Sequence, residues 1–457
     1  MSFGTERALR LRPAFHLARL LSRLAATPPP ALVASVVVLL AFGRFVPIGF
    51  ASSDWWPALA TNTLSAPVDL VRLFREPLGG ADPQYIAATA RHYRPLAVAS
   101  YALDYHLWGL DHPVGWQLTN FLVHLGVTLG VYALARQLRV PTWASLLSAV
   151  VFTLHPGIVA VEPAIARRHD TLSGLFLLAS LILLLRGRLV LGAVTFGCSV
   201  LSKETSLAAL PLVPVVLYVA ERPLRWAGVL VVPTAIALGL RLLALGDLGG
   251  YGTVERPSIE GLGPYRDSFI QYLAAFLSPG PPAPTKIAVG NEAIGVALVV
   301  ILAALACPRR ERIIALLGLA WLLVFGEFYA YLRVYGAWYL YLPLIGPALS
   351  VGALAAGGLA RISTATGKLP ALLASLAVVL LLRASPLLTP YPEWSSVARL
   401  SAEYLASVDR CAEPGDPPLV PAEKGPMNEF VDATGLADYS VSAYLALRYP
   451  SGRPCAS

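Results

Sequence analysis

Long apolar stretches, separated by two alternating kinds of polar segment, constrain this chain more than any other feature of its sequence. A spanning helix needs roughly 20 apolar residues, and by this measure the chain holds about eleven candidates. They are 30–50, 114–135, 142–157, 171–186, 189–202, 206–220, 226–245, 292–307, 313–328, 338–357 and 369–387. Only 14% of the 457 residues are charged, whereas soluble domains average about 25%. The sequence therefore predicts an all-α polytopic membrane protein.

The charges of the connecting segments predict how the chain is oriented. Five connections are short and basic, namely 136–141, 186–188, 221–225, 308–312 and 361–368. Cytoplasmic loops carry an excess of Lys and Arg, so these segments are expected inside. The acids and histidines concentrate in the other connections: 51–113, 158–170, 202–205, 246–291, 329–337 and 388–457. These segments are expected outside.

This orientation predicts three regions. They are a cytoplasmic tail over 1–29, a transmembrane domain over 30–387 and a small extracytoplasmic tail over 388–457. The basic N-terminal segment resembles the start of a signal peptide, but the apolar run after it lacks a small-residue cleavage site, so we interpret it as a signal anchor. The net charge of +8 lies largely in short loops and predicts no nucleic-acid partner. A composition rich in Ala, Leu, Arg and Pro indicates a prokaryotic plasma membrane.

Two of the external loops are too long to be simple connectors. Residues 51–113 and 246–291 contain short amphipathic stretches, at 68–74 and 265–277. Such stretches favour helices that lie on the membrane surface, and loops of this length usually cap a site. Cys411 and Cys455 flank a polar part of the C-terminal tail; a disulfide between them and a pair of free thiols are both compatible with the sequence.

Asp54 follows the first apolar run and is next to Trp55 and Trp56. One interpretation is an aromatic belt at the membrane interface with an incidental acid. The other is a general base that takes a proton from an acceptor hydroxyl.

The segment before the second apolar run contains Arg94 in the sequence Tyr-Arg-Pro-Leu, with Asp104 ten residues later. The two side chains form either a solvated ion pair or, in the functional interpretation, a site in which Arg94 holds an anionic group such as a phosphate.

A mixed cluster of charges lies between the third and fourth apolar runs, where His155, Glu162, Arg168 and Asp170 fall within sixteen residues. A solvated loop is the plain interpretation. The functional interpretation assigns the His and Arg side chains to a phosphate and the carboxylates to orienting them or binding a sugar.

Lys203 and Glu204 join two apolar runs with almost no loop between them. Charges at that depth are costly unless they pair with each other or line a polar cavity, where the lysine reaches a lipid phosphate. Arg333 and Tyr339 belong to a segment rich in tyrosine, which suits either sugar rings and a phosphate or a membrane interface. His124, within an apolar run, is interpreted as a packing residue. No spacing typical of zinc ligands occurs, and Asp54 alone offers too few oxygens for a metal site.

These motifs together resemble the GT-C superfamily of membrane glycosyltransferases, especially the protein O-mannosyltransferases and the transmembrane-and-tetratricopeptide-repeat proteins. The matching stretches include Tyr-Arg-Pro-Leu at 93–96, the segment 100–110, the segment 117–124, His-Pro at 155–156, Val-Glu-Pro-Ala at 161–164, Arg-His-Asp at 168–170, Leu-Ser-Lys-Glu at 201–204 and Trp-Tyr-Leu-Tyr-Leu-Pro at 338–343. The resemblance covers roughly 50–220 and 335–347.

The resemblance implies a GT-C-like bundle and an inverting glycosyltransferase. Such an enzyme moves a sugar, mannose or another hexose, from a polyprenyl-phosphate carrier to an acceptor hydroxyl on the extracytoplasmic face. Asp54 is at the position of the family's essential acid, and the lipid-linked sugar is a substrate, so that no metal or other cofactor is expected. Membrane lipids are expected partners, and the acceptor is a protein, a lipid or a glycan.

Three departures from the family pattern keep other functions open. Ser53 replaces the first member of a frequent acidic pair, Ala337-Trp338 replaces a Glu-Arg pair, and no tetratricopeptide repeats follow in this sequence. A catalytically inactive scaffold that binds a lipid-linked sugar is one alternative. A transporter or lipid flippase is another, although that class usually shows charges near mid-membrane and an internal repeat.

Overall fold

The structure is a computed structural model of the 457-residue chain. It describes residues 29–51, 56, 59–60, 69–78, 92–247, 292–331, 337–362, 364–411, 413, 415, 438–449 and 451. Every regular element in this part of the chain is a helix. The prediction of an all-α fold is therefore confirmed.

The N-terminal half of the bundle follows the predicted apolar runs closely. Its elements are α2 (Pro30–Phe42), η1 (Gly43–Ile48), α4 (Leu70–Arg75), α6 (Pro95–Trp108), α7 (Pro113–Gln137), α8 (Thr142–Leu154), η2 (Pro156–Ala160), η3 (Ile165–Arg167), α9 (Arg168–Leu185), α10 (Leu189–Ser202), η4 (Glu204–Leu212), α11 (Val213–Val219), η5 (Leu224–Leu230) and α12 (Val231–Leu245). Prolines sit at the first turns of α2, α6 and α7, where the missing N–H is not needed.

The C-terminal half adds α14 (Glu292–Ala306), α15 (Arg309–Tyr331), η7 (Ala337–Leu340), α16 (Ile345–Ala360), α17 (Ala365–Ala384), α18 (Pro392–Asp409) and α20 (Asp438–Arg448). Each of the eleven predicted spans thus overlaps at least one helix. Four described helices are long and apolar enough to cross a membrane: Pro30–Ile48, Pro113–Gln137, Ile165–Leu185 and Leu224–Leu245. The chain is a multi-pass membrane protein, and eleven crossings remain a prediction.

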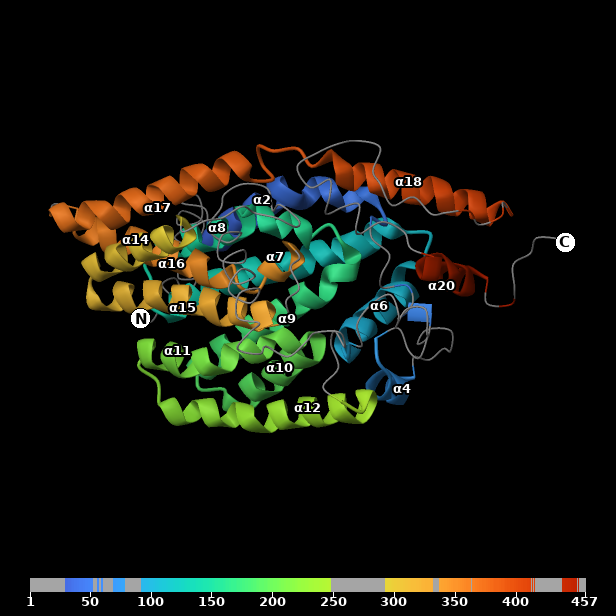
Figure 1. The fold of residues 1–457 in the computed structure, drawn as a ribbon, viewed down its shortest axis with the longest axis horizontal. Helices are drawn as coiled ribbons and strands as arrows, with labels where there is room; N and C mark the ends of the chain where they lie inside the picture. The colour runs from blue at the N-terminus through green and yellow to red at the C-terminus, as the bar shows by residue number, and fades with distance from the viewer. Residues whose placement is uncertain are drawn as a thin grey trace, which may run out of the picture.

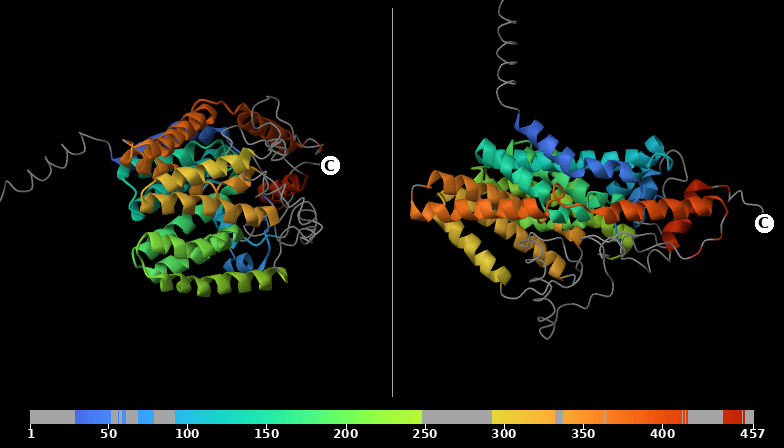
Figure 2. Two further views of the ribbon diagram at one scale, coloured as in Figure 1. Left: turned by 60° about the vertical axis from the view of Figure 1, so that its left-hand side comes forward. Right: turned by 90° about the horizontal axis from the view of Figure 1, so that it is seen from above.

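The helices form a layered bundle (Figure 1). Helix α9 packs against both α7 and α10, and α16 packs against α8, α15 and α17. Seen from above, α17 and α18 follow one line along the bundle, with α2 on one side and α14 and α15 on the other (Figure 2). The outer helices α2, α12 and α17 expose large apolar side chains, such as Leu40, Leu243 and Leu372. Apolar faces of this kind suit contact with lipid.

Small residues let the helices approach closely inside the bundle. A Cβ atom at Gly318 of α15 would lie 2.2 Å from the backbone oxygen of Gly346 on α16, and the Ser350 hydroxyl donates to the Ala315 carbonyl at 2.8 Å. Packing of small residues and hydroxyl hydrogen bonds are the usual means by which helices associate in lipid, where no hydrophobic force drives them together.

One end of the bundle carries α4, α6, α20 and the far part of α18 (Figure 1). The amphipathic stretch at 68–74 forms α4, whose first turn is capped by Asp69, because its carboxylate accepts from the Arg72 N–H at 3.0 Å. The stretch at 265–277 lies outside the described residues. Cys411 is disulfide-bonded, whereas Cys198 and Cys307 are free thiols; Cys455 lies outside the described part.

Candidate functional site

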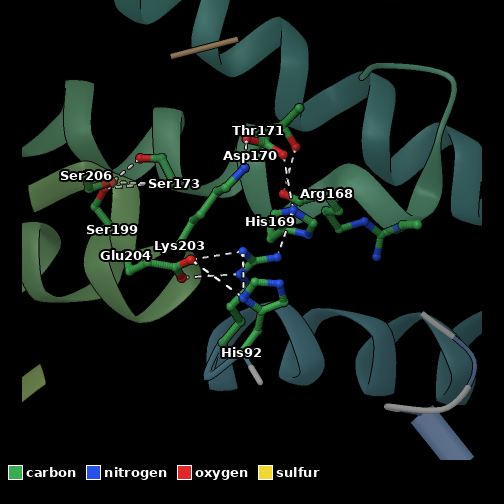
Figure 3. Close-up of polar contacts among 12 residues, drawn as sticks. His92, Arg168, His169, Asp170, Thr171, Ser173, Ser199, Lys203, Glu204 and Ser206 are labelled. Carbon is green, nitrogen blue, oxygen red and sulfur yellow. Dashed lines mark hydrogen bonds and ion pairs between the residues drawn. The ribbon is translucent and has the colours of Figure 1, made fainter. Parts of the chain in front are cut away.

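A cluster of buried charges joins the start of α6, the start of α9 and the break between α10 and η4 (Figure 3). Helix α12 adds Arg241 to this cluster. The cluster residues are Arg94, Asp170, Lys203, Glu204 and Arg241, with His92 and His169. Buried charges in a membrane protein are costly and mark functional sites.

Arg94 is the N-cap residue of α6 and points into the bundle. Its Nη2 atom lies 3.0 Å from Glu204 Oε1 and its Nε atom 3.3 Å from Glu204 Oε2, so both carboxylate oxygens are engaged. Its Nη1 atom lies 3.1 Å from His169 Nε2. His92 is beside this pair, and burial together with the Arg94 charge holds the pKa of His92 well below its usual range. Arg94 and Glu204 are 110 residues apart in the sequence and meet here in a two-point contact. The planar guanidinium and the carboxylate have matching geometry for such a contact.

Lys203 occupies a break in a helical segment. Helix α10 ends at Ser202, the backbone of Lys203 is extended, and η4 begins at Glu204. Non-helical backbone inside a membrane protein is tolerated only where protein or a polar cavity surrounds it. The Lys203 ammonium donates to Asp170 Oδ1, and the Tyr339 ring centroid lies 5.0 Å from Lys203 Nζ.

Asp170 lies in the first turn of α9, where the helix dipole favours a negative charge. Its second oxygen, Oδ2, lies 3.1 Å from His169 Nε2. Asp170 thus connects Lys203 to His169, and His169 connects this pair to Arg94. The sequence-predicted residues Arg94, Asp170, Lys203, Glu204 and Tyr339 are brought together.

Two members of the cluster were missed by the sequence reasoning. Arg241 lies on α12, is 7% exposed, and its Nη1 atom lies 3.5 Å from Glu204 Oε2. The signal was present, since Arg241 is the only charged residue within the apolar run 226–245. His92 is also buried, and it carried no motif that set it apart from the long loop around it.

The structure places Arg168 in a second polar cluster. Its side chain points away from Lys203 and Glu204 (Figure 3) and is fully buried. Its Nη1 atom forms an ion pair with Asp104 Oδ2 at 2.6 Å, and its Nε atom donates to Asn120 Oδ1 at 2.6 Å. Its remaining hydrogen bonds go to the carbonyls of Ser100 at 3.3 Å and Trp116 at 3.0 Å.

Glu162 and His155 lie apart from the ion pairs described above. Glu162 is 1% exposed and its Oε2 atom has no hydrogen-bond partner among the described residues. Burial raises the pKa of the Glu162 carboxyl well above its usual range. His155 ends α8 because proline follows it and disfavours helical backbone, and its Nδ1 atom accepts from the Gly157 N–H at 3.0 Å.

One further sequence prediction can be placed. His124 is fully buried between aromatic rings, and its Nδ1 atom lies 2.7 Å from the Tyr341 hydroxyl, as suits a packing residue. The predictions for Asp54 and Arg333 lie outside the described residues.

The cluster of buried charges brings cations and carboxylates into contact. Arg94, Lys203 and Arg241 face the two carboxylates Glu204 and Asp170. The Glu204 side chain is the most exposed of these five, at 19%. Three cations beside two carboxylates, of which Glu204 is partly exposed, suit an anionic group such as a phosphate.

Part of this sequence is similar to known protein O-mannosyl-transferases. Human protein O-mannosyl-transferase TMTC4 is 29% identical over 164 residues, which cover 33% of this chain and 22% of that protein. Drosophila melanogaster protein O-mannosyl-transferase Tmtc1 is 28% identical over 169 residues, covering 35% and 19%. The chain therefore spans about a fifth of the length of these relatives. No family model matches the chain.

A solved structure has a loosely similar shape. The crystal structure of ArnT from Cupriavidus metallidurans bound to undecaprenyl phosphate superposes with a TM-score of 0.47 at 15% identity, over 92% of this chain and 88% of that one. In sequence, the chain is similar over about a third of its length to protein O-mannosyl-transferases of the transmembrane-and-tetratricopeptide-repeat group, and this confirms the resemblance that its motifs predicted.

Proposed function

We propose that this protein is a membrane glycosyltransferase that takes a sugar from a polyprenyl-phosphate carrier and transfers it, with inversion, to an acceptor hydroxyl. The observation that carries the proposal is the buried cluster in which Arg94, Lys203 and Arg241 lie beside Glu204 and Asp170. The similarity to protein O-mannosyl-transferases supports the same class of reaction and favours mannose or another hexose.

In the proposed reaction the acceptor oxygen attacks the anomeric carbon while the bond from that carbon to the phosphate oxygen breaks. The electron pair of the broken bond stays on the phosphate, and the acceptor proton passes to the carboxylate of Asp54. The leaving polyprenyl phosphate gains negative charge as the bond breaks. Cations placed beside it stabilise the transition state more than the ground state, which is what accelerates a reaction.

The cations are assigned according to their partners in the structure. Arg94, Lys203 and Arg241 take the phosphate oxygens, and Glu204 and Asp170 hold these cations in place when no phosphate is bound. Tyr339 shields Lys203 from one side. The reaction as proposed uses no metal ion or organic cofactor, because the side chains themselves take up the charge.

Arg168 and Asp104 have a positioning role in this proposal. Arg168 contacts Asp104 and the Ser100 carbonyl on α6, and Asn120 and the Trp116 carbonyl on α7. These contacts fix the start of α9 against α6 and α7. His155 caps the segment between α8 and α9 through its contact with the Gly157 N–H. Glu162 and Arg333 stay assigned to the substrate side from their sequence context.

The wider assignments remain those of the sequence. We propose a cytoplasmic N-terminus, an extracytoplasmic site and C-terminus, and a transmembrane domain over 30–387 between the tails 1–29 and 388–457. The lipid carrier and membrane lipids are the partners, and the acceptor is a protein, lipid or glycan. The composition points to a prokaryotic membrane, while the relatives named above are animal proteins.

The test is turnover of labelled polyprenyl-phosphate mannose by the purified protein in lipid, with glucose and arabinose donors in parallel. We expect release of the carrier phosphate by the wild type, its loss in Asp54→Asn, and no change in Glu403→Gln, which alters an exposed carboxylate of α18. Saturable donor binding without turnover of any of the three would instead support an inactive lipid-sugar binder. Absence of binding would overturn the proposal and reopen the transporter class.

A further inference from the structure

The C-terminal helices close a separate hydrophobic core at one end of the bundle (Figure 1). This end core joins Leu405 of α18 and Tyr444 and Leu447 of α20 to Trp56, Tyr101 and Trp116. All six are at least nine-tenths buried. Residues more than 300 positions apart in sequence therefore share one core, and α18 and α20 are part of the folded body.

Polar contacts fasten α20 to this end of the bundle. Arg448 pairs with Asp111, and the Tyr105 hydroxyl donates to the Leu447 carbonyl at 3.4 Å. The Tyr444 hydroxyl donates to Asp409 Oδ2 of α18 at 2.8 Å. A helix of eleven residues is marginal in isolation, so these contacts are what keep it formed.

A chain of ring contacts runs from α20 toward the buried arginine. The ring centroids of Tyr444 and Trp56 lie 5.2 Å apart, those of Trp56 and Phe50 5.7 Å, and those of Phe50 and Trp116 5.9 Å. The guanidinium carbon of Arg168 then lies 5.9 Å from the Trp116 ring centroid. The Trp56–Phe50 and Phe50–Trp116 pairs are edge-to-face and the Tyr444–Trp56 pair is tilted. Aromatic and cation–π contacts at these separations are attractive.

The same end core holds the backbone that leads into the candidate site. The Tyr101 hydroxyl lies 3.1 Å from the carbonyl oxygens of both Ile165 and Ala166. His169 and Asp170 follow within five residues and form one side of the charged cluster. A shift of Tyr101 therefore moves the start of α9, and with it the partner of Lys203.

We propose that α20 is a positioning element of the candidate site, with Tyr444 as its positioning residue. Tyr444 acts through Trp56, Phe50 and Trp116 on Arg168, and through the shared core on the segment that leads to Asp170. The effect on ligand affinity rests on the proposed function; the effect on the backbone of α9 does not.

The experiment compares Tyr444→Ala, Tyr444→Phe and the control Ala446→Ser, which changes an exposed position of the same helix. Amide hydrogen exchange of peptides covering 161–175 reports the backbone. Binding of undecaprenyl phosphate in lipid nanodiscs reports the charged cluster without requiring turnover. Leu447→Val, which only shortens a buried side chain of α20, serves if Tyr444→Ala does not purify as a folded protein.

We expect exchange in 161–175 to rise at least about tenfold in Tyr444→Ala, because local opening exposes these amides. The dissociation constant for undecaprenyl phosphate should rise by about tenfold in the same variant. Tyr444→Phe keeps the ring and should restore both readouts to near wild type, which loss of fold alone would not explain.

Unchanged exchange in 161–175 in a folded Tyr444→Ala or Leu447→Val protein would overturn the inference. Wild-type protein that binds no undecaprenyl phosphate would instead refute the proposed function, and the exchange comparison would still decide the role of α20.

Discussion

Replacing Arg168 with methionine tests whether its buried pair is structural, as its geometry indicates. The Arg168 side chain is fully buried and Asp104 is 1% exposed, with 2.6 Å between Nη1 and Oδ2. Methionine keeps much of the apolar stem but removes the charge. It leaves the Asp104 carboxylate buried, with the Thr119 hydroxyl at 2.8 Å as a remaining partner.

The expected loss follows from burial. Removing one partner of a buried ion pair costs about 3–5 kcal/mol, because an uncompensated charge stays in a medium of low polarity. An exposed pair contributes only about 0–1 kcal/mol. The chain offers a matched exposed pair, Arg139 and Glu221, whose side chains are 51% and 58% exposed and whose closest atoms lie 3.0 Å apart.

The assay is unfolding in mixed micelles of rising SDS content, read as the free energy of unfolding. We expect Arg168→Met to lose several kcal/mol and Arg139→Met less than about 1 kcal/mol. The double variant Arg168→Met/Asp104→Leu should recover much of the loss, because no buried charge is then left unpaired. Equal losses in Arg168→Met and Arg139→Met, or no recovery in the double variant, would refute the reasoning.

Three further predictions concern the cluster, the buried acid and the packing of helices. Lys203→Met should weaken binding of undecaprenyl phosphate by at least about tenfold, since a charge-assisted hydrogen bond contributes about 1.5–3 kcal/mol and 1.4 kcal/mol is tenfold; equilibrium binding measures this, with the exposed Lys368→Met as control. Burial raises the pKa of Glu162, so the folded state holds its proton more tightly and wild-type stability falls as pH rises above the unfolded value of about 4.3. The free energy of unfolding of Glu162→Gln should therefore rise relative to that of wild type between pH 5 and 8 in the micelle assay. A difference between the two proteins that does not change with pH would contradict the raised pKa of Glu162. Gly318→Ala should destabilise strongly because its Cβ would overlap the α16 backbone, whereas Gly239→Ala, with nothing within 4 Å of its Cβ, should not; thermal denaturation in detergent distinguishes the two.

The apolar runs predicted the helices well, because the membrane imposes one requirement on length and composition. The run 189–202 coincides with α10, and the other predicted runs overlap observed helices, some of them divided between a 3-10 helix and an α-helix. The C-terminal helices were a different case. Periodicity in 392–409 and 438–448 is visible in the sequence, yet what these helices pack on depends on residues such as Trp56 and Trp116 far away in the chain.

For the candidate site as well, the sequence predicted some features and not others. The charges that share a local motif, Lys203 with Glu204 and His169 with Asp170, were recognisable because their position between apolar runs is costly. The direction in which each side chain points was not recognisable. Arg168 and His169 are neighbours in sequence, but one is enclosed by Asp104 and Asn120 and the other faces Arg94. That difference arises from which face of the first turn of α9 each residue occupies.

The two clusters differ in a way that separates holding a helix from holding a ligand. Arg168 faces an ion-pair partner, an amide oxygen and two carbonyls, and it lies where the side chain has no exposure. Arg94, Lys203 and Arg241 share two carboxylates among three cations, and one of those carboxylates, Glu204, is partly exposed. A satisfied buried pair gains nothing from an incoming anion, because binding would first have to break it. Cations that share a partly exposed carboxylate can exchange that contact for one with a phosphate, so we propose that the chain binds its anion at the break between α10 and η4.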